Sequence, residues 1–427
     1  MNKSSDQSPA IQSLEKRTFT LHLISQFFHG IAFGTLLLQD IILKKSLFAS
    51  DFEITLLIFL TSSAFLFSIY GVEMINRSNN PAMTIIIMAA ASKVFLLFIP
   101  LFEDAGFFIF CIAVMSFIDS MIRPTWNAVY KHNYTEENRS KLYSYASSLF
   151  TIVLLVIITL FGQLLDVDYK VYKIFYPLAG ITDFISLYIL AKLVSKGNGD
   201  YLKKVKKFGA GISFKLIEDI LILPVRNLMR IFKVNKPFFR FERNFFFYGM
   251  ALMIASPAIP IYLVQELNFD YSPISIAKGL AFHVAMIIFT PLMGRMHGSG
   301  KPAKFCGYVF SSLVLYPVLL IFIKYLDNGF LFISNDMMLF ITFFIFGISM
   351  SGVILSWNLS SIYYAPAAEV SNYQAVHITL TGIRGIFSPF IGFAIMKLFS
   401  ISVTFVVSAL LFLFAGIMMF LESRRKD

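Results

Sequence analysis

The chain has 427 residues, of which 57% are hydrophobic and 14% are charged, whereas a soluble domain is typically about 25% charged. This composition excludes an ordinary soluble protein and indicates a polytopic membrane protein. The net charge of +11 does not require a nucleic-acid partner, because the basic residues lie mainly in the loops between apolar stretches, as the positive-inside rule describes.

The first 18 residues are polar and lack the pattern of a cleavable signal peptide. A series of apolar stretches follows, each long enough to cross a bilayer as a helix. We therefore expect an all-α fold with twelve transmembrane helices. In chain order, the expected spans are 19–43, 52–74, 82–102, 106–130, 142–165, 172–194, 239–264, 273–295, 304–325, 337–362, 374–398 and 400–421.

A long basic segment separates the sixth span from the seventh. It reads "KGNGDYLKKVKKFGAG" and continues as "ISFKLIEDILILPVRNLMRIFK". The second piece has the pattern of an amphipathic helix lying in the membrane interface, and a plain tethering linker is the alternative. The expected organisation is a six-helix bundle at 1–195, a cytoplasmic linker with an interfacial helix at 196–237, and a second six-helix bundle at 238–427.

The distribution of charge predicts the orientation. Most of the 36 Lys and Arg residues fall in the tails and in the even-numbered loops. Both termini are therefore expected on the cytoplasmic side of the inner (cytoplasmic) membrane. The two cysteines, Cys111 and Cys306, lie inside apolar spans and are expected to be free thiols. We expect a monomer.

Short matches between the two halves indicate a duplication. The only two tryptophans, Trp126 and Trp357, are each followed by Asn near the ends of the fourth and tenth spans. The first span carries "FFHG" at 27–30, and the seventh carries "FFYG" at 246–249. The second and eighth spans end in "GVEMINRSNNP" and "GRMHGSGKP". Three matches at corresponding places predict an internal repeat.

With this 6+6 plan, basic central linker and internal repeat, the chain resembles the major facilitator superfamily over nearly its whole length. The superfamily's Gly-x-x-x-Asp-Arg loop motif is only partly present, since Gly71 and Arg77 remain, Asn76 stands near the Asp position, and the spacing is off by one. The fifth span lacks the Pro and Gly residues of the superfamily's drug/proton antiporters. The resemblance implies two pseudosymmetric six-helix bundles and a secondary active transporter that works by alternating access.

An arginine stands in the middle of the eleventh span, in the stretch "VHITLTGIRGIFSPFIG" at 376–392. His377, Thr381, Arg384 and Ser388 share one helix face. Because an ionisable residue within a membrane is a candidate functional site, we expect this stripe to face the central cavity and Arg384 to bind an anionic substrate. The alternative is a structural arginine bonded to helix carbonyls.

The first span repeats this pattern with His22, Gln26 and His29 on one face. Histidine titrates near neutral pH, so His22 and His29 are predicted to couple proton movement to transport, and Gln26 to contact substrate. Metal binding is not expected, because no cysteine or carboxylate lies close by in the sequence.

The fourth span carries Asp119 and Arg123, four residues apart, where they can pair on one face, and Asn127 continues the stripe. The pair is either a structural lock or a cavity switch. We assign Asp119 to proton coupling, and Arg123 and Asn127 to substrate binding. Lys93 and Asp183, near the middles of the third and sixth spans, are predicted to form a structural ion pair.

The balance of charge within the spans predicts the class of substrate. Among the intramembrane groups singled out here, four cations outnumber two carboxylates: Arg123, Arg384, Lys93 and Lys278 against Asp119 and Asp183. Such a surplus favours a small anionic or zwitterionic solute over a lipophilic cation. Protons are the expected coupling ion, since no sodium site is legible.

Two other functions stay open at this point. A lipid or lysolipid flippase on the same fold would use the many phenylalanines to line an apolar cavity, and a non-transporting receptor or scaffold would show no gradient-driven flux. No nucleotide-binding, zinc or nucleophile–base motif is present, so we expect neither an enzyme nor a cofactor.

Overall fold

The structure is a computed structural model that describes residues 9–196, 226, 228–298, 301–326, 333–366 and 369–425. The described residues form helices and the turns between them, without strands. Most of the expected interfacial helix, up to residue 225 and at residue 227, lies outside the described residues. Residues 228–234 form a short helical stretch that leads into the second half.

The first half contains six helical runs, three of which are interrupted or extended by 3₁₀ turns. The runs are α1 Pro9–Leu36 with α2 Gln39–Lys45; α3 Asp51–Ser63, η1 Ala64–Phe67 and α4 Ser68–Arg77; α5 Pro81–Phe98 with η2 Ile99–Leu101; α6 Ala105–Asn133; α7 Glu136–Val167 with η3 Tyr169–Val171; and α8 Tyr172–Lys196. Local sequence explains several starts. Ser50 and Glu53 form a capping box at α3, and Asn80 and Asp104 cap α5 and α6.

The second half contains six further runs. They are α10 Lys236–Ala255 with α11 Ala258–Ile261 and the π turn η5 Tyr262–Glu266; α12 Tyr271–Ile276, the π turn η6 Ala277–Ala281 and α13 Phe282–His297; α14 Pro302–Ser312 with α15 Leu315–Leu326; α16 Asn335–Leu359 with η7 Ser360–Tyr364; α17 Val370–Leu398; and α18 Ile401–Ser423. Eleven helices of the described chain are long and apolar enough to cross a membrane, and α3–η1–α4 occupies the place of the remaining expected span. The twelve-helix fold is confirmed.

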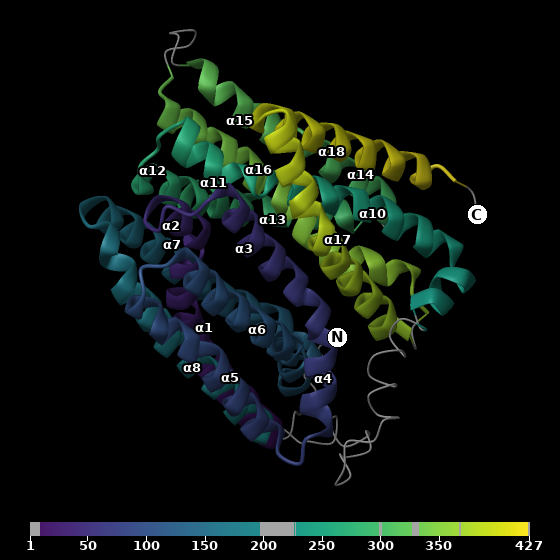
Figure 1. Ribbon diagram of the computed structural model, residues 1–427. Coiled ribbons are helices and arrows are strands. Elements are labelled where there is room, and N and C mark those ends of the chain that lie inside the picture. Colours follow the sequence, from purple (N-terminus) through teal and green to yellow (C-terminus); the bar gives the residue numbers. More distant parts are fainter. Residues whose placement is uncertain are drawn as a thin grey trace.

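Each half packs mainly on itself (Figure 1). In the first half α1 packs on α7 and α8, and in the second half α10 packs on α17 and α18. Glycines of the repeated FFHG and FFYG sequences permit both close contacts. A Cβ atom at Gly30 would lie 2.9 Å from the Phe150 carbonyl oxygen, and one at Gly249 would lie 2.0 Å from Cζ of Arg384. Trp126 lies on α6 and Trp357 on α16, the fourth and tenth runs.

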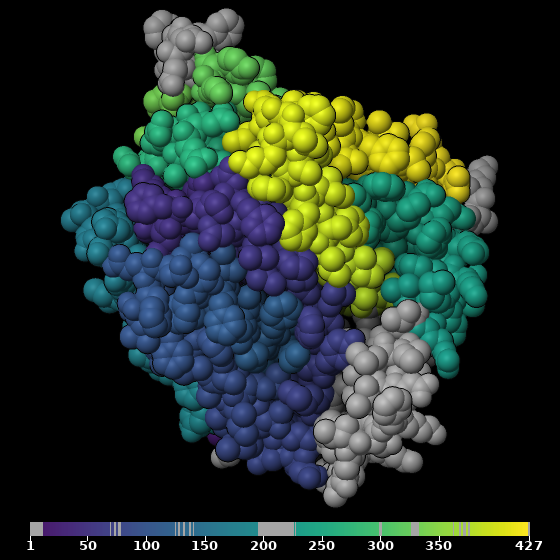
Figure 2. Space-filling model, viewed as in Figure 1, coloured from purple at the N-terminus to yellow at the C-terminus, as the bar shows by residue number. Residues whose placement is uncertain are grey.

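The halves meet where α3 lies against α17, the purple and yellow surfaces that touch in Figure 2, and where α7 lies against α12. Within the described part of the chain, the hydrogen bonds and ion pairs that join the halves gather at one end, which we call the closed end. Lys45 contacts Asp270 at 2.8 Å, and Lys278 contacts Asp40 at 2.6 Å. The Asp166 carboxylate accepts hydrogen bonds from the backbone nitrogens of Tyr271 and Ser272 at the start of α12.

Further charges at the closed end stay within one half. The loop before α6 presents Glu103 to Lys170 and Lys173, at 2.9 and 2.5 Å. The hydrogen bonds from Lys173 and Lys170 hold the pKa of Glu103 below its usual range.

Candidate functional site

A cavity of about 280 Å³ lies among the helices of the first half. Its polar wall carries His29 from α1, Asp119 and Arg123 from α6, and Asp183 from α8. The remaining lining is contributed by Phe33, Leu36, Leu37, Gln39, Thr61, Ser62, Ala64, Phe65, Met115, Ser116 and Ser120. Its size fits a small solute or a cluster of water molecules.

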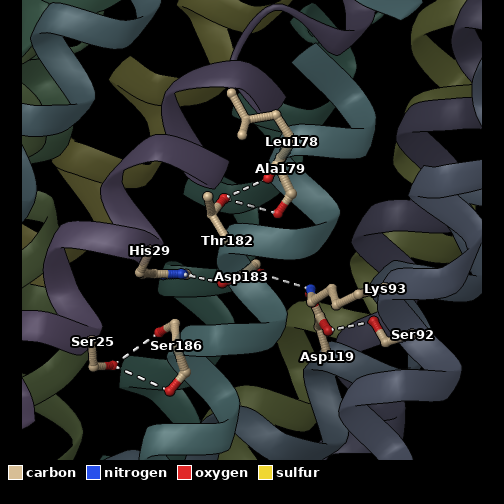
Figure 3. A network of polar contacts seen from close by, with 10 residues as sticks. All are labelled: Ser25, His29, Ser92, Lys93, Asp119, Leu178, Ala179, Thr182, Asp183 and Ser186. Carbon is tan, nitrogen blue, oxygen red and sulfur yellow. Dashed lines mark hydrogen bonds and ion pairs between the residues drawn. The ribbon is translucent and has the colours of Figure 1, made fainter. Parts of the chain in front are cut away.

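Behind this wall, Lys93 contacts two carboxylates at once (Figure 3). Its Nζ lies 2.7 Å from Asp183 and in direct contact with Asp119. Ser92 donates a hydrogen bond of 2.6 Å to the second oxygen of Asp119. The pairing of Lys93 with Asp183 was predicted from the sequence, whereas the contribution of Asp119 and Ser92 was not.

His29 brings this group of charges to the cavity surface. Its Nδ1 lies 2.8 Å from Asp183, and its side chain is 35% exposed, against 5% for Asp183 and 2% for Lys93. We call His29, Asp183, Lys93 and Asp119 the cavity network. With a neutral histidine the network has one cation and two carboxylates, so it carries a formal charge of −1. One proton on His29 neutralises it.

Arg123 stands alone in the cavity. The sequence paired it with Asp119 on the i, i+4 rule, and that pairing is wrong because Lys93, reaching across from α5, binds Asp119 instead. Arg123 is exposed, and its guanidinium has no hydrogen bond or ion pair with another described residue. The cavity therefore presents one free cation, among the described residues, beside the cavity network.

The polar stripe of α17 does not face an open cavity in this conformation, which corrects the prediction for Arg384. Arg384 is 4% exposed and donates hydrogen bonds to the Phe245 carbonyl oxygen at 3.2 Å and to the Thr381 hydroxyl at 3.1 Å. Its guanidinium lies 5.9 and 5.8 Å from the ring centres of Phe245 and Tyr248. The space left by Gly249 on α10 admits it. These contacts match the structural alternative for Arg384.

The other residues of that stripe are buried with it. His377 Nδ1 lies 3.0 Å from both carboxylate oxygens of Glu242, and the two side chains are 1% and 2% exposed. Trp357 packs edge-on against the His377 ring and directs its Nε1 toward Thr381. His377 and Thr381 were predicted to bind substrate, and in this conformation they join α17 to α10 and α16. We call Glu242, His377, Thr381 and Arg384 the buried network.

The residues of the stripe predicted on the first span, His22, Gln26 and His29, do not share one environment. His29 lines the cavity, whereas His22 is buried beneath Tyr130, with ring centres 3.8 Å apart, and its Nδ1 lies 3.0 Å from the Tyr134 hydroxyl. The prediction that His22 shares the site of His29 is therefore wrong, because tyrosines of α6 cover it. Gln26 is partly buried and does not line this cavity. The side chain of Asn127 lies outside the described residues.

The surplus of positive charge predicted from the sequence is smaller in the structure. Asp40, which adds a negative charge to the groups considered from the sequence, binds Lys278, and Arg384 is buried away from this cavity. With neutral His29, the charges of Arg123, Lys93, Asp119 and Asp183 cancel. Asp40 lies near the end of the first expected span and Lys278 lies inside the eighth, so charge complementarity was the only available signal for this pair.

No metal site emerges from the described residues, where no group of three or more His, Cys, Asp or Glu side chains could hold an ion. The cavity can bind both an anionic and a cationic group of a solute. Arg123 can hold a carboxylate or phosphate, and the cavity network can accept a proton or bind an amine.

Comparison with known proteins agrees with this architecture. Residues 243–427 match the family model described as Major Facilitator Superfamily. Among curated proteins, none matches the sequence.

Solved structures match over nearly the whole chain. The nucleoside transporter NupG is 10% identical, with a TM-score of 0.73 over 95% of this chain and 99% of that chain. A POT family transporter in complex with a thioalcohol-conjugated peptide is 13% identical, with a TM-score of 0.69 over 95% and 96%. The human organic anion transporter MFSD10 is 12% identical, with a TM-score of 0.62 over 97% and 100%. At these identities the similarity shows the fold. The proteins matched are transporters and not enzymes.

Proposed function

We propose that this chain, which has the fold of the major facilitator superfamily, is a multi-pass membrane transporter that moves a small zwitterionic or anionic solute together with a proton. One observation carries the proposal, namely the unpaired Arg123 beside the cavity network. No nucleotide-binding motif is present to supply energy, so transport is driven by a gradient across the membrane.

The substrate's anionic group binds Arg123. An arginine fork can hold a carboxylate or phosphate through two parallel hydrogen bonds and keeps its charge in a partly dehydrated site. Thr61, Ser62 and Ser116 line the same cavity and offer hydrogen bonds to the rest of the solute. An amine on the substrate would find its counter-charge at Asp119, which is 16% exposed.

Charge balance links the substrate to a proton. When an anion binds Arg123, the cavity region with a neutral histidine carries a net charge of −1. A proton taken up by His29 cancels that charge, so substrate and proton each strengthen the binding of the other. This reciprocity favours movement of the two in the same direction.

The orientation follows from the charge distribution. Cytoplasmic termini would put the closed end on the external side, because it consists of odd-numbered loops. The conformation described here is then open toward the cytoplasm. The Lys45–Asp270 and Lys278–Asp40 contacts would have to separate when the two bundles rock to the other state.

A ligand screen on purified protein tests the proposal. The panel takes its classes from the similar structures (peptides, nucleosides and organic anions), with amino acids and organic cations added, each measured by thermal shift at pH 5.5 and 7.5. We expect compounds with a carboxylate or phosphate to stabilise the protein. For a compound that stays anionic at both pH values, the stabilisation should be stronger at pH 5.5. Arg123→Gln should remove the shift, and Lys304→Gln, an exposed cation on α14, should keep it.

Proteoliposome uptake of the best ligand then tests coupling, since an inward proton gradient should drive accumulation. Stabilisation by organic cations alone, or an unchanged ligand shift in Arg123→Gln, would contradict the proposed substrate class.

A further inference from the structure

A second cavity lies far from Arg123 in the sequence and in the fold, at the end of α10 where the linker enters. Its volume is about 240 Å³, and it is lined by Phe232, Phe239, Glu242, Arg243, Phe246, Phe247 and Leu380. Four of these seven residues are phenylalanines, and the one carboxylate, Glu242, is turned inward to His377. The groove is therefore apolar, with an arginine at its edge.

The contacts of α10 show which way this groove faces. Glu242 points to α17, Asn244 donates to the Met418 carbonyl of α18, and Tyr248 stacks on Phe310 in the core of the second half. Among the described residues, other helices meet α10 mainly on these three sides, and Phe246 also packs against Phe387 of α17. Phe239 and Arg243 project on the side that is left, and both are exposed. No other described helix covers this face, which in a membrane leaves it open to lipid.

Basic and aromatic side chains share that face of α10. Lys236, Phe239, Arg243 and Phe246 follow spacings of three, four and three residues, which place them on one stripe of the helix. Cations and phenylalanines alternate along this stripe, from Lys236 in the first turn of α10 to Phe246 farther along the helix. Lys233 and Lys236 are exposed and have no ion pair with a described residue, while Arg243 bonds only to the amide oxygen of the adjacent Asn244 among described residues.

We propose that this groove is a binding site for an anionic phospholipid. The headgroup phosphate binds Arg243 and Lys236, and an acyl chain lies along Phe239 and Phe246. The charge pattern selects this occupant over a zwitterionic lipid, because basic residues at the cytoplasmic edge of a membrane helix attract anionic headgroups. The lipid binds outside the transport cavity and packs against the helix that carries Glu242, one end of the buried network.

Thermal unfolding of the purified full-length protein in a neutral detergent, titrated with phosphatidylglycerol, tests the site. Phosphatidylglycerol should raise the unfolding temperature, and phosphatidylcholine at the same mole fraction should raise it much less. Inorganic phosphate should have no effect, since it lacks the acyl chain. The double variant Lys236→Gln, Arg243→Gln should bind phosphatidylglycerol about thirtyfold more weakly, equivalent to about 2 kcal/mol for two cations.

Two more variants separate a built site from general surface charge. Phe239→Ser keeps both cations and should weaken the response to phosphatidylglycerol. Lys304→Gln removes an exposed cation elsewhere and should leave it unchanged. The proposal is overturned by equal stabilisation from both lipids, by an equal response to inorganic phosphate, or by a double variant that binds phosphatidylglycerol as tightly as the unaltered protein.

Discussion

A histidine–carboxylate pair joins two helices in each half of the molecule, and the two pairs differ in their access to water. His29 and Asp183 connect α1 to α8 at the cavity wall, where the histidine is 35% exposed. His377 and Glu242 connect α17 to α10, where both side chains are at most 2% exposed. The same chemical groups can therefore exchange protons with a cavity in one half and hold helices together in the other.

The two arginines differ in the same way. Arg123 is exposed in the cavity and has no partner among the described residues, while Arg384 is bonded to a backbone carbonyl and flanked by two aromatic rings. Exposure, more than residue type, separates the group that can bind a ligand from the group that stabilises the fold. The variants below test that separation, from the largest expected effect to the smallest.

Asp183→Asn should cause the largest loss of stability. It leaves buried Lys93 with Asp119 as its only carboxylate and takes the partner from His29. Breaking a buried pair commonly costs about 3–5 kcal/mol. Chemical denaturation of the purified variant measures this cost. Exchanging the two residues, Lys93→Asp with Asp183→Lys, should restore part of it, and Asp119→Asn should cost less because Lys93 keeps Asp183. A fully stable and active Asp183→Asn protein would refute the structural role.

Arg384→Ala should lower the free energy of unfolding by about 1.5–3 kcal/mol, the usual value of hydrogen bonds made by a charged group. Ligand affinity in the protein that folds should stay close to that of the unaltered chain. Gly249→Ala should reproduce the loss of stability, because its Cβ would collide with the guanidinium. If Arg384→Ala instead folds normally and loses ligand binding, the comparison between the two arginines fails.

Arg123→Gln should show the opposite pattern. Loss of a charge-assisted hydrogen bond worth about 1.5–3 kcal/mol predicts a ligand affinity lower by about ten- to a hundredfold. The unfolding temperature without ligand should hardly change, since the side chain is exposed. Arg123→Lys keeps the charge without the fork and should fall between the two. Affinity and melting temperature measured on the same preparations would show whether binding and stability separate.

His29→Gln should abolish accumulation driven by a pH gradient while leaving exchange between equal pools of substrate. The matched variant His377→Gln should retain gradient-driven accumulation, because its pair has no access to the cavity. Uptake and counterflow in proteoliposomes distinguish these outcomes. Equal loss of accumulation in both variants would show that exposure in this conformation does not identify the proton carrier.

Glu103→Gln should have the smallest effect on stability, and it serves as a reference for the other variants. The pKa of Glu103 is lowered by hydrogen bonds from Lys173 and Lys170, so the contribution to stability is present above the ordinary carboxylate range and is lost as the pH falls through the folded-state pKa. The difference in unfolding temperature between the variant and the unaltered protein should shrink as the pH is lowered toward 3. A difference that grows on acidification would contradict this sign.

The sequence predicted the helices and their repeat because both depend on local composition. Twelve apolar stretches, and matched elements such as Trp126 and Trp357, are legible without knowledge of packing. The sequence does not show which face of a helix packs against which neighbouring helix. The spacing correctly placed His377 and Arg384 on one stripe, but whether that stripe meets a cavity or α10 depends on the packing of α10 and on the space left by Gly249.

The same limit explains the errors in pairing. The i, i+4 rule pairs Asp119 with Arg123 from the sequence of one helix, whereas Lys93 comes from another helix and reaches Asp119 in the buried interior. His22 and His29 are seven residues apart on one face, yet tyrosines near the end of α6 cover only the first. Tertiary contacts decided each case, and a single sequence does not contain them.

The π turn that carries Lys278 has a mechanical consequence. η6 spans Ala277–Ala281, and a π turn holds an extra residue relative to the α-helix. Conversion of this turn to regular α-helix would rotate one side of the run relative to the other by about 100°, the rotation per residue. Lys278 lies within this turn, so such a rotation would change its position relative to Asp40 and strain the ion pair at the closed end. A shift of register within this helix and the parting of the two halves would thus be a single movement, with the backbone of η6 as its pivot.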